Sequence, residues 1–291
     1  RSSHGTPAGT VGRFRTQPTW KKMTKTMLIT GASSGIGKAT AKLFAARGWN
    51  VVATMRTPEK EVELRAFDNV LVTQLDLTDA ASIRSAVEAA ISRFGRVDAL
   101  LNNAGYAVWG PLEAVSTDAM RKQYETNVIG VMETIKALVG HFRANRAGLI
   151  LNVSSIGGIL TFPLGTLYHG TKFAIEGLSE ALSFEMREIG VTVKIIEPGD
   201  TLTGFKVEFA TDDAMPEYQP VIEKFAQGYK PIKAAGSEPI VIAEVIFRAA
   251  TDGTDQLRYP AGDDSVAKVA KRKAEDEATF LADIRRQFAI N

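Results

Sequence analysis

Short apolar runs rich in β-branched residues alternate with stretches of helical spacing along most of this chain. The runs lie at 26–30, 50–54, 70–75, 98–101, 148–153 and 191–196. Between them, stretches such as GKATAKLFAARG and DAASIRSAVEAAISRFG repeat apolar side chains at intervals of three and four residues. A strand followed by a helix, repeated in this way, predicts a parallel sheet covered by helices on both faces. We therefore expect a doubly wound α/β fold in a single domain over residues 23–291.

Two segments depart from this alternation. Residues 200–235 contain Pro216, Pro220 and Pro231 and two aromatic clusters, which predicts an excursion of short helices and loop that approaches the substrate. Residues 1–22 have no helical or strand periodicity and carry five bases and no acid. We interpret them as a disordered leader or expression tag, with an Arg-rich transit peptide as the alternative.

Charge and composition exclude several classes of protein. Without the five leader bases, the chain has 30 bases and 33 acids, so its body is mildly acidic and does not favour nucleic acid as a partner. The basic run KVAKRK is followed at once by AEDE, which is typical of a solvated helix. The chain has no cysteine and three histidines, so we expect no metal site, and a zinc alcohol dehydrogenase is disfavoured. No apolar run approaches the roughly 18 residues of a membrane span, and a cytoplasmic protein is expected.

A glycine-rich segment, TGASSGIG, follows the first predicted strand directly. Its glycines are Gly31, Gly35 and Gly37. Glycine lets a backbone turn sharply and approach a pyrophosphate closely, and the N-terminus of the following helix offers free N–H groups. The position of this segment predicts a dinucleotide site, whereas a tight turn without a ligand would need only one or two of the glycines.

A second pattern places a phenol and an ammonium one helical turn apart. In the segment YHGTK, Tyr168 and Lys172 are separated by four residues, so they share one face of a helix. A shielded ammonium can lower the pKa of a tyrosine from its usual value near 10, so such a pair is suited to proton transfer. Taken alone, the pair would fit an amphipathic helix whose polar tips reach solvent.

Together these motifs resemble the short-chain dehydrogenase/reductase family. The family pattern TGxxxGxG matches the glycine segment, and further matches follow in the family's order from Lys25 to Gly199, together with a plausible C-terminal helix. They are LDLTD at 75–79, NNAG at 102–105, Asn127, the Ser154–Ser155 pair, Tyr168 with Lys172, and PG at 198–199. The resemblance implies a Rossmann-type fold and an oxidoreductase that transfers hydride between a nicotinamide coenzyme and a carbonyl or alcohol.

The resemblance also implies four catalytic residues. Tyr168 is expected as general acid/base, and Lys172 is expected to lower the tyrosine pKa and to hold the nicotinamide ribose. Asn127 would link the lysine to solvent through water. Successive side chains at a strand end point in opposite directions, so only one serine of the pair faces the site. The family's spacing to the tyrosine selects Ser155.

The coenzyme contacts follow from the same resemblance. Sites that prefer NAD usually carry an acid at the end of the second strand, whereas a 2′-phosphate favours arginine. Here Met55 stands where the acid would be and Arg56 follows, so we expect NADP(H), with NAD(H) as the alternative. The full set of expected cofactor-binding residues is Gly31, Ser33, Ser34, Gly35, Ile36, Gly37, Arg56, Asp76, Leu77, Asn103, Ala104, Gly105, Tyr168, Lys172, Pro198, Gly199, Thr201 and Thr203.

The substrate is less constrained than the coenzyme. The segments GGILTFPLGTL and FKVEFATDDAMPEYQPVIEKF offer aliphatic and aromatic walls, which suit an apolar ketone, aldehyde or alcohol. The segment around Tyr168 also resembles the hydroxysteroid and retinol dehydrogenases. The alternatives are an NAD-dependent alcohol dehydrogenase of the same family and a non-catalytic dinucleotide-binding regulator. A homodimer or homotetramer, paired through the helices that bear Asn127 and Tyr168, is what the resemblance implies.

Trp109 and His169 lie beside the predicted motifs and are not assigned to the site. Trp109 either lines the substrate cleft or fills the core. His169 follows Tyr168 directly and so points about 100° around the helix, which favours a structural role.

Overall fold

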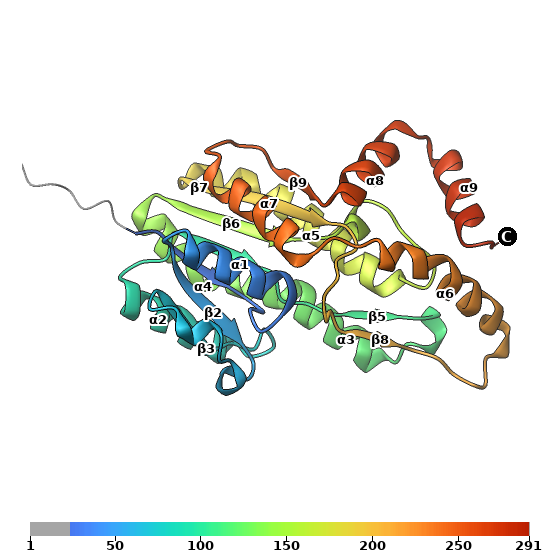
Figure 1. Cartoon of the computed structure of the whole chain (residues 1–291), viewed down its shortest axis with the longest axis horizontal. Coiled ribbons are helices and arrows are strands. Elements are labelled where there is room, and N and C mark those ends of the chain that lie inside the picture. The colour runs from blue at the N-terminus through green and yellow to red at the C-terminus, as the bar shows by residue number, and fades with distance from the viewer. Residues whose placement is uncertain (1–23, 291) are drawn as a thin grey trace, which may run out of the picture.

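Seven parallel strands form the central sheet of the computed structural model, which describes residues 24–290 (Figure 1). Their order is β3-β2-β1-β4-β6-β7-β9. The bounds are β1 (Thr26–Ile29), β2 (Asn50–Met55), β3 (Val70–Gln74), β4 (Ala99–Asn102), β6 (Gly148–Val153), β7 (Val191–Pro198) and β9 (Arg258–Ala261). The predicted doubly wound sheet is therefore confirmed, and all six runs identified in the sequence are strands of it.

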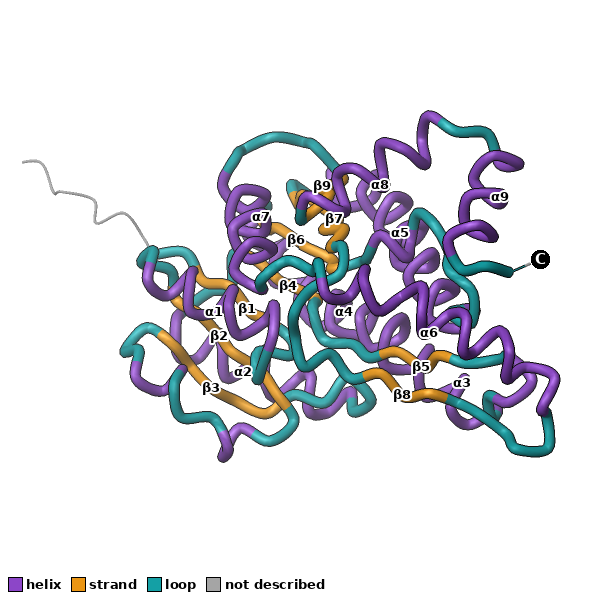
Figure 2. The backbone as a smooth tube through the Cα atoms, turned by 45° about the vertical axis from the view of Figure 1, so that its right-hand side comes forward, coloured by secondary structure: helices purple, strands orange, loops and turns teal. Residues whose placement is uncertain are grey.

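Helices cover both faces of this sheet (Figure 2). On one face, α1 (Gly35–Ala46) packs beside α7 (Pro239–Thr251), and Phe44 and Ile246 join the core there. On the other face lie α2 (Ala80–Phe94), α4 (Gly130–Asn145) and α5 (Thr166–Glu188), which contribute Leu138 and Ile175 to a second core. Apolar burial on both faces explains why these strands are continuous apolar runs rather than alternating ones.

The edge strand β9 is not among the predicted runs. It pairs in parallel with β7, with Ile196 opposite Tyr259 and Glu197 opposite Pro260. A proline cannot donate to a strand ladder, so a run that contains one is tolerated only at a sheet edge. The strand is too short and too polar in sequence to be recognised without its partner.

The excursion at 200–235 is more regular than predicted. It contains β8 (Val207–Phe209), which pairs with β5 (Ala107–Trp109) in a separate two-stranded sheet, a 3-10 turn at Pro216–Tyr218, and the helix α6 (Gln219–Ala234). The expectation of short helices and loop is wrong for α6, a helix of 16 residues. Pro220 lies in its first turn, where the missing N–H has no helical partner to lose, and Pro231 lies near its end.

Two further helices, α8 (Asp263–Ala274) and α9 (Glu277–Gln287), follow β9 and lie at the same end of the molecule as α6 (Figure 1). The expected solvated helix at KVAKRK is α8. Phe288, just after α9, stacks on Phe225 of α6 and packs edge-on against Phe162. Residues 1–22, interpreted as a leader or tag, lie outside the described residues. Within the described part, no helix is both long enough and apolar enough to cross a membrane.

Candidate active site

The glycine segment lies at the carboxyl end of β1, next to β4, where the strand order reverses and ligands of open α/β sheets bind. Gly31 and Gly35 adopt φ values of +71° and +54°, a region that favours glycine. Ser34 caps α1 without a side-chain hydrogen bond, and the first turn of α1 holds no acid. The N–H groups of this turn are therefore open to an anion, as a pyrophosphate requires.

The segment NNAG braces this glycine turn. Asn103 Nδ2 donates to the carbonyls of Thr30 and Gly31, at 2.9 and 3.1 Å. The Thr30 hydroxyl accepts from the backbone N–H groups of Asn103 and Ala104. A Cβ added at Gly37 would lie 2.2 Å from the Gly31 carbonyl oxygen, so only glycine permits this close approach of helix and loop.

The other predicted coenzyme residues lie along the same edge of the sheet. Arg56 is exposed directly after β2, and Asp76 and Leu77 follow β3 within two or three residues. The Asp76 carboxylate accepts from the N–H and hydroxyl of Thr78, so it also stabilises the turn that follows β3. Gly105 lies close to the Asn127 side chain.

The segment after β7 closes over the glycine turn. Pro198 ends β7, and a Cβ added at Gly199 would clash with the Asp264 carboxylate. Thr201 forms a bridge with Ser237, while Thr203 lies so close to Gly35 that an added Cβ there would contact it at 3.1 Å. Serines 33 and 34 are exposed beside them, and Ile36 packs on the core.

Tyr168 and Lys172 share one face of α5, as the spacing predicts. Lys172 Nζ lies 5.8 Å from the centroid of the Tyr168 ring and donates to the Val153 carbonyl at 2.9 Å. Val153 is the last residue of β6, so the ammonium is anchored to the carboxyl end of the sheet.

The electrostatics of this pair differ from the expectation. Burial raises the pKa of Tyr168 to about 12, a hydrogen bond with Ser155 partly opposes this, and Asp200 adds to the rise. Burial also lowers the pKa of Lys172 to about 8. The expectation that Lys172 brings the tyrosine pKa down is therefore wrong for this structure. The reason is that the ammonium points to the Val153 carbonyl, while loss of water disfavours both charged forms.

The two serines at the end of β6 face different surroundings. The Ser155 hydroxyl accepts from the N–H of Gly157 at 3.0 Å and lies beside the Tyr168 phenol. Ser154 is buried on the other side, against Gly158 and Glu176. The structure thus brings Ser155 rather than Ser154 to Tyr168.

Asn127 lies in a π-helical turn, Glu125–Ile129, between α3 (Thr117–Tyr124) and α4. Its side chain binds one backbone segment and α5: Oδ1 accepts from the N–H of Tyr106 at 3.1 Å, while Nδ2 donates to the Tyr106 carbonyl at 2.8 Å and to the Thr171 hydroxyl at 3.3 Å. π-Helical turns occur often at functional sites because they displace backbone groups from the regular ladder. An interior asparagine was the signal in the sequence, but the π-turn itself was not predicted.

An aromatic cluster extends from Tyr168 toward α6, and the sequence indicated Trp109 and Phe225 of it, the latter as the end of the aromatic segment 205–225, but not Tyr229. Trp109 stacks on Tyr168 with ring centroids 6.1 Å apart, and on its other side it stacks on Phe225 at 5.1 Å. Tyr229 stacks on Phe225 and donates to Asp200 at 2.5 Å. Trp109 is therefore part of a buried cluster that includes the tyrosine, which confirms the core interpretation, and its place in a substrate cleft stays a prediction.

His169 has the expected structural role. Its Nε2 accepts from the N–H of Phe162 at 2.9 Å, which leaves Nδ1 to donate to the Gly157 carbonyl at 2.8 Å. Burial lowers its pKa, so the ring is held neutral.

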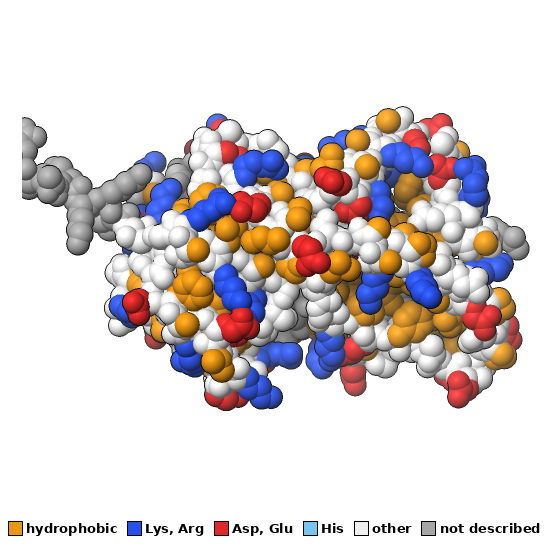
Figure 3. Space-filling model, viewed as in Figure 1, with side chains coloured by type: hydrophobic (Ala, Val, Ile, Leu, Met, Phe, Trp, Pro, Cys, Tyr) orange, Lys and Arg blue, Asp and Glu red, His pale blue; other side chains and the backbone are white. Residues whose placement is uncertain are grey.

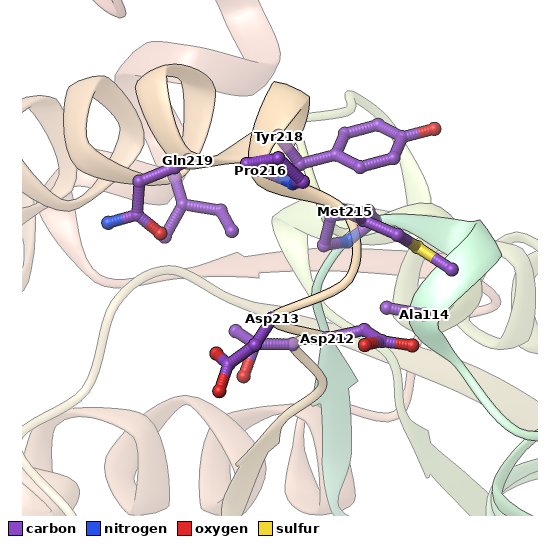
Figure 4. A pocket seen from close by; sticks show the side chains of 10 residues that line it. Ala114, Asp212, Asp213, Met215, Pro216, Tyr218 and Gln219 are labelled. Atoms are coloured by element: carbon purple, nitrogen blue, oxygen red, sulfur yellow. The ribbon is translucent and has the colours of Figure 1, made fainter.

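A pocket of about 270 Å³ lies between the segment after β5 and the start of α6 (Figure 4). Its lining includes Ala114, Asp213, Met215 and Tyr218, and no residue of the predicted catalytic set. It belongs to the excursion rather than to the reacting groups around Tyr168.

Comparison with known proteins decides the family. A family model described as short chain dehydrogenase matches residues 25–214. The chain is a short-chain dehydrogenase. The motif resemblance is therefore confirmed, and with it the assignment to an oxidoreductase family.

Two curated relatives cover most of this short-chain dehydrogenase. An uncharacterized oxidoreductase of Schizosaccharomyces pombe is 51% identical over 236 residues, which are 81% of this chain and 100% of the relative. A 3-ketodihydrosphingosine reductase of Bacteroides thetaiotaomicron is 33% identical over 91% of this chain and 96% of its own.

Solved structures agree with the fold, and two of the three named below hold a nicotinamide coenzyme. A short-chain dehydrogenase from Streptomyces avermitilis has a TM-score of 0.79 and 31% identity, covering 90% of this chain and 96% of its own. ElxO with NADP bound has a TM-score of 0.67 and 27% identity, covering 81% and 97%. The 3-ketoacyl-(acyl-carrier-protein) reductase of Brucella melitensis, in complex with NADH, has a TM-score of 0.68 and 27% identity, covering 80% and 96%. A nicotinamide dinucleotide is therefore the coenzyme class that the glycine turn fits.

Proposed function

We propose that this short-chain dehydrogenase reduces an apolar ketone or aldehyde to an alcohol with NADPH. The observation that carries the proposal is the convergence of Ser155, Tyr168 and Lys172 at the sheet edge that holds the glycine turn. The bound coenzyme supplies the hydride for the carbonyl carbon. The protein's own groups act on the oxygen: Ser155 donates a hydrogen bond to it, and the Tyr168 phenol gives it a proton.

The protonation states support reduction. Burial holds the Tyr168 phenol in its protonated form at neutral pH, which is the form that can donate to a growing oxyanion. Lys172 anchors the nicotinamide ribose in this proposal, and its charge offsets the negative charge that develops beside it. Asn127 holds the backbone of Tyr106 and so keeps the π-turn in place.

The preference for NADPH rests on Arg56. Its guanidinium is exposed directly after β2, where an acid would select NADH, and Ser33 and Ser34 are exposed in the glycine turn nearby. An arginine can bind a 2′-phosphate through two parallel hydrogen bonds.

An apolar substrate is supported by the surroundings of Tyr168. Trp109 and Phe205 pack on the Tyr168 ring, and the segment after β7 exposes Leu202, Val207 and Phe209. The space-filling view shows apolar side chains gathered at the end of the molecule formed by α6, β5 and β8 (Figure 3). The relatives from Bacteroides and Brucella are named as reductases of 3-keto compounds, which agrees with carbonyl reduction.

NADPH oxidation against a panel of long-chain 3-keto compounds, aryl ketones and aldehydes tests this function. The parent is expected to turn over at least one apolar member, and Tyr168→Phe to lose about 10²–10⁴-fold in kcat because one proton donor is removed. NADPH binding by Tyr168→Phe, measured by fluorescence, is expected to stay close to that of the parent. A variant as fast as the parent would show that Tyr168 is not the acid. Tight NADPH binding without turnover of any panel member would favour a regulatory protein.

A further inference from the structure

Glu176 is a buried carboxylate one turn beyond Lys172 on α5, outside the set of catalytic residues. It is only 5% exposed. Its Oε2 accepts from Nε of Arg258 at 3.0 Å, so a side chain from the edge strand β9 reaches across to α5. A carboxylate is rarely buried so deeply unless it is paired, and Arg258 is the cation that pairs with it.

Close packing holds Glu176 next to the backbone of the catalytic segment. A Cβ added at Gly158 would lie 2.6 Å from the Ser154 hydroxyl oxygen, 2.9 Å from Glu176 Cγ and 3.0 Å from the Lys172 carbonyl oxygen. These atoms therefore surround one glycine and leave no room for a methyl group. Because Lys172 and Glu176 are both buried, bulk water screens their interaction weakly.

The charges around this pair are few. They are Tyr168 and Glu180 on α5, Glu197 on β7, Asp200 just after β7, Arg258 on β9 and Lys273 on α8. Burial lowers the pKa of Lys172, and Glu176 is the acid whose charge raises it again. The charge of Asp200 raises the pKa of Tyr168 rather than that of Lys172.

Arg258 binds Glu176 more closely than it binds the neighbouring carboxyl of Glu197. Its Nε lies 3.6 Å from Glu197 Oε1, and among the described residues neither carboxyl oxygen of Glu197 has a hydrogen-bond partner. Burial and the charge of Glu176 raise the pKa of Glu197 to about 7. Burial raises the pKa of Glu176 as well, and hydrogen bonds from Ser154 and Arg258 and the charges of Arg258 and Lys172 oppose that rise. One arginine between two buried carboxyls thus favours the charged form of Glu176 over that of Glu197, which can hold a proton.

We propose that Glu176 is a positioning residue that keeps Lys172 in its charged form across one turn of α5, and that Arg258 keeps Glu176 charged in turn. A line of alternating charges, Arg258, Glu176 and Lys172, then connects the edge strand β9 to the reacting groups, with an ion pair between the first two and a charge effect across one helical turn between the last two. The role that this gives to Lys172 rests on the proposed function, but the titration of its ammonium can be measured without turnover.

The direct test is a pH titration of Lys172 by NMR of protein labelled with ¹³C at lysine Cε, the signal being assigned by its absence in Lys172→Arg. In Glu176→Gln, an isosteric change, the Lys172 midpoint is expected to fall by about one pH unit, because a buried opposite charge one helical turn away is lost. Glu180→Gln is the matched control. Glu180 binds the same arginine at 2.6 Å but its side chain is 50% exposed, so its loss should leave the midpoint close to that of the parent.

Two more variants complete the titration. Glu176→Asp keeps the charge and is expected to restore most of the parent midpoint, which a purely structural role would not do. Arg258→Gln leaves Glu176 in place without its cation, so the carboxyl takes up a proton and the Lys172 midpoint falls as in Glu176→Gln. If Glu176→Gln does not fold, the Lys172 midpoint in Arg258→Gln tests the same link. A midpoint that is unchanged in the folded variants, or that moves equally in Glu180→Gln, overturns the proposal.

Turnover separates this proposal from the proposed function. If the parent oxidises NADPH with a panel member, the alkaline limb of its kcat/KM profile is expected to move to lower pH in Glu176→Gln, with about fivefold lower activity at pH 8 for a one-unit shift. If the parent has no turnover, the proposed function fails while the NMR midpoints still decide the role of Glu176.

Discussion

Burial sets the protonation states of individual residues in this protein. At Tyr168, the rise of the pKa to about 12 corresponds to about 3 kcal/mol in favour of the phenol. The same loss of water acts on Lys172 with opposite sign, since its charged form is the protonated one. Burial therefore favours the neutral form of both groups, while the charge of Glu176 opposes this effect at Lys172, which with a pKa of about 8 still carries most of its charge at pH 7.

A residue-scale prediction concerns the coenzyme. Arg56→Ala is expected to weaken NADPH binding by about tenfold or more, since a charged hydrogen bond contributes about 1.5–3 kcal/mol. NADH has no 2′-phosphate, so its affinity should stay near the parent value. Fluorescence titration of both coenzymes measures this, with Arg65→Ala as control for charge. An unchanged ratio of the two affinities would rule out Arg56 as the selector.

A second residue-scale prediction concerns Glu197. Its pKa rises from 4.5 to about 7 on folding, so the folded state holds a proton that the unfolded state releases. The contribution of this proton to the free energy of unfolding is fully present below pH 4.5 and is lost as the pH rises through about 7. Glu197→Gln is therefore expected to unfold at higher urea than the parent at pH 8.5, by up to about 3 kcal/mol, and to lose this advantage near pH 4.5. Equal gains at both pH values would contradict the assignment.

At the scale of elements, Lys194 joins β7 to its neighbours. Its buried ammonium donates to the Ala249 carbonyl on α7 at 2.8 Å, to Asp252 at 2.6 Å and to the Tyr259 hydroxyl on β9 at 2.9 Å. Each ammonium proton thus has an acceptor, which makes this lysine a fixed connection between the last strands and α7.

Lys194→Met is expected to cost about 3 kcal/mol of stability, because it removes the donor from the buried Ala249 carbonyl and Tyr259 hydroxyl as well as the cation beside Asp252. Thermal denaturation should show a fall in Tm of about 10 °C, from about 2–4 °C per kcal/mol in a chain of this size. Lys136→Met is the control, since its ion pair with Glu133 is exposed and should matter by less than about 1 kcal/mol. Similar losses in both variants would show that the Lys194 network adds nothing specific.

At the scale of the whole molecule, the outer surfaces of α4 and α5 carry exposed apolar side chains. Phe184 is 71% exposed and Phe173 45% on α5, and Met132 is 36% exposed on α4. Several such side chains on neighbouring helices are typical of a protein–protein contact. Because α5 also bears Tyr168, self-association there would stabilise the helix that carries the site.

We predict that the chain self-associates through these helices. Phe184→Glu is expected to shift the parent oligomer toward monomer, as measured by size-exclusion chromatography with light scattering, because a charge cannot be buried unpaired in such a contact. Val62→Glu, at a side chain that is 77% exposed between β2 and β3, is the control and should leave the mass unchanged. A parent protein with the mass of a monomer in this measurement would contradict the prediction.

The sequence predicted the parts of the molecule that depend on local pattern. The first six strands of the sheet were predictable because each is a continuous apolar run, and the glycine turn was predictable because backbone geometry demands glycine there. Strand β9 and the pair β5–β8 were not, because each is short and is stabilised by a partner far away in the chain. The π-turn at Asn127 likewise depends on its hydrogen bonds with Tyr106.

The chain itself, through residue order and spacing, determined the fold class, the position of the coenzyme turn and the alignment of Tyr168 with Lys172. Only the tertiary structure decided the charges on those two side chains. A pKa depends on how much water is lost and on which charges lie close by. Here Glu176 lies on α5 itself, but the other groups come from separate parts of the sheet edge: Val153 at the end of β6, Asp200 just after β7 and Arg258 on β9. Spacing along one helix can bring two side chains together, but it cannot show what surrounds them.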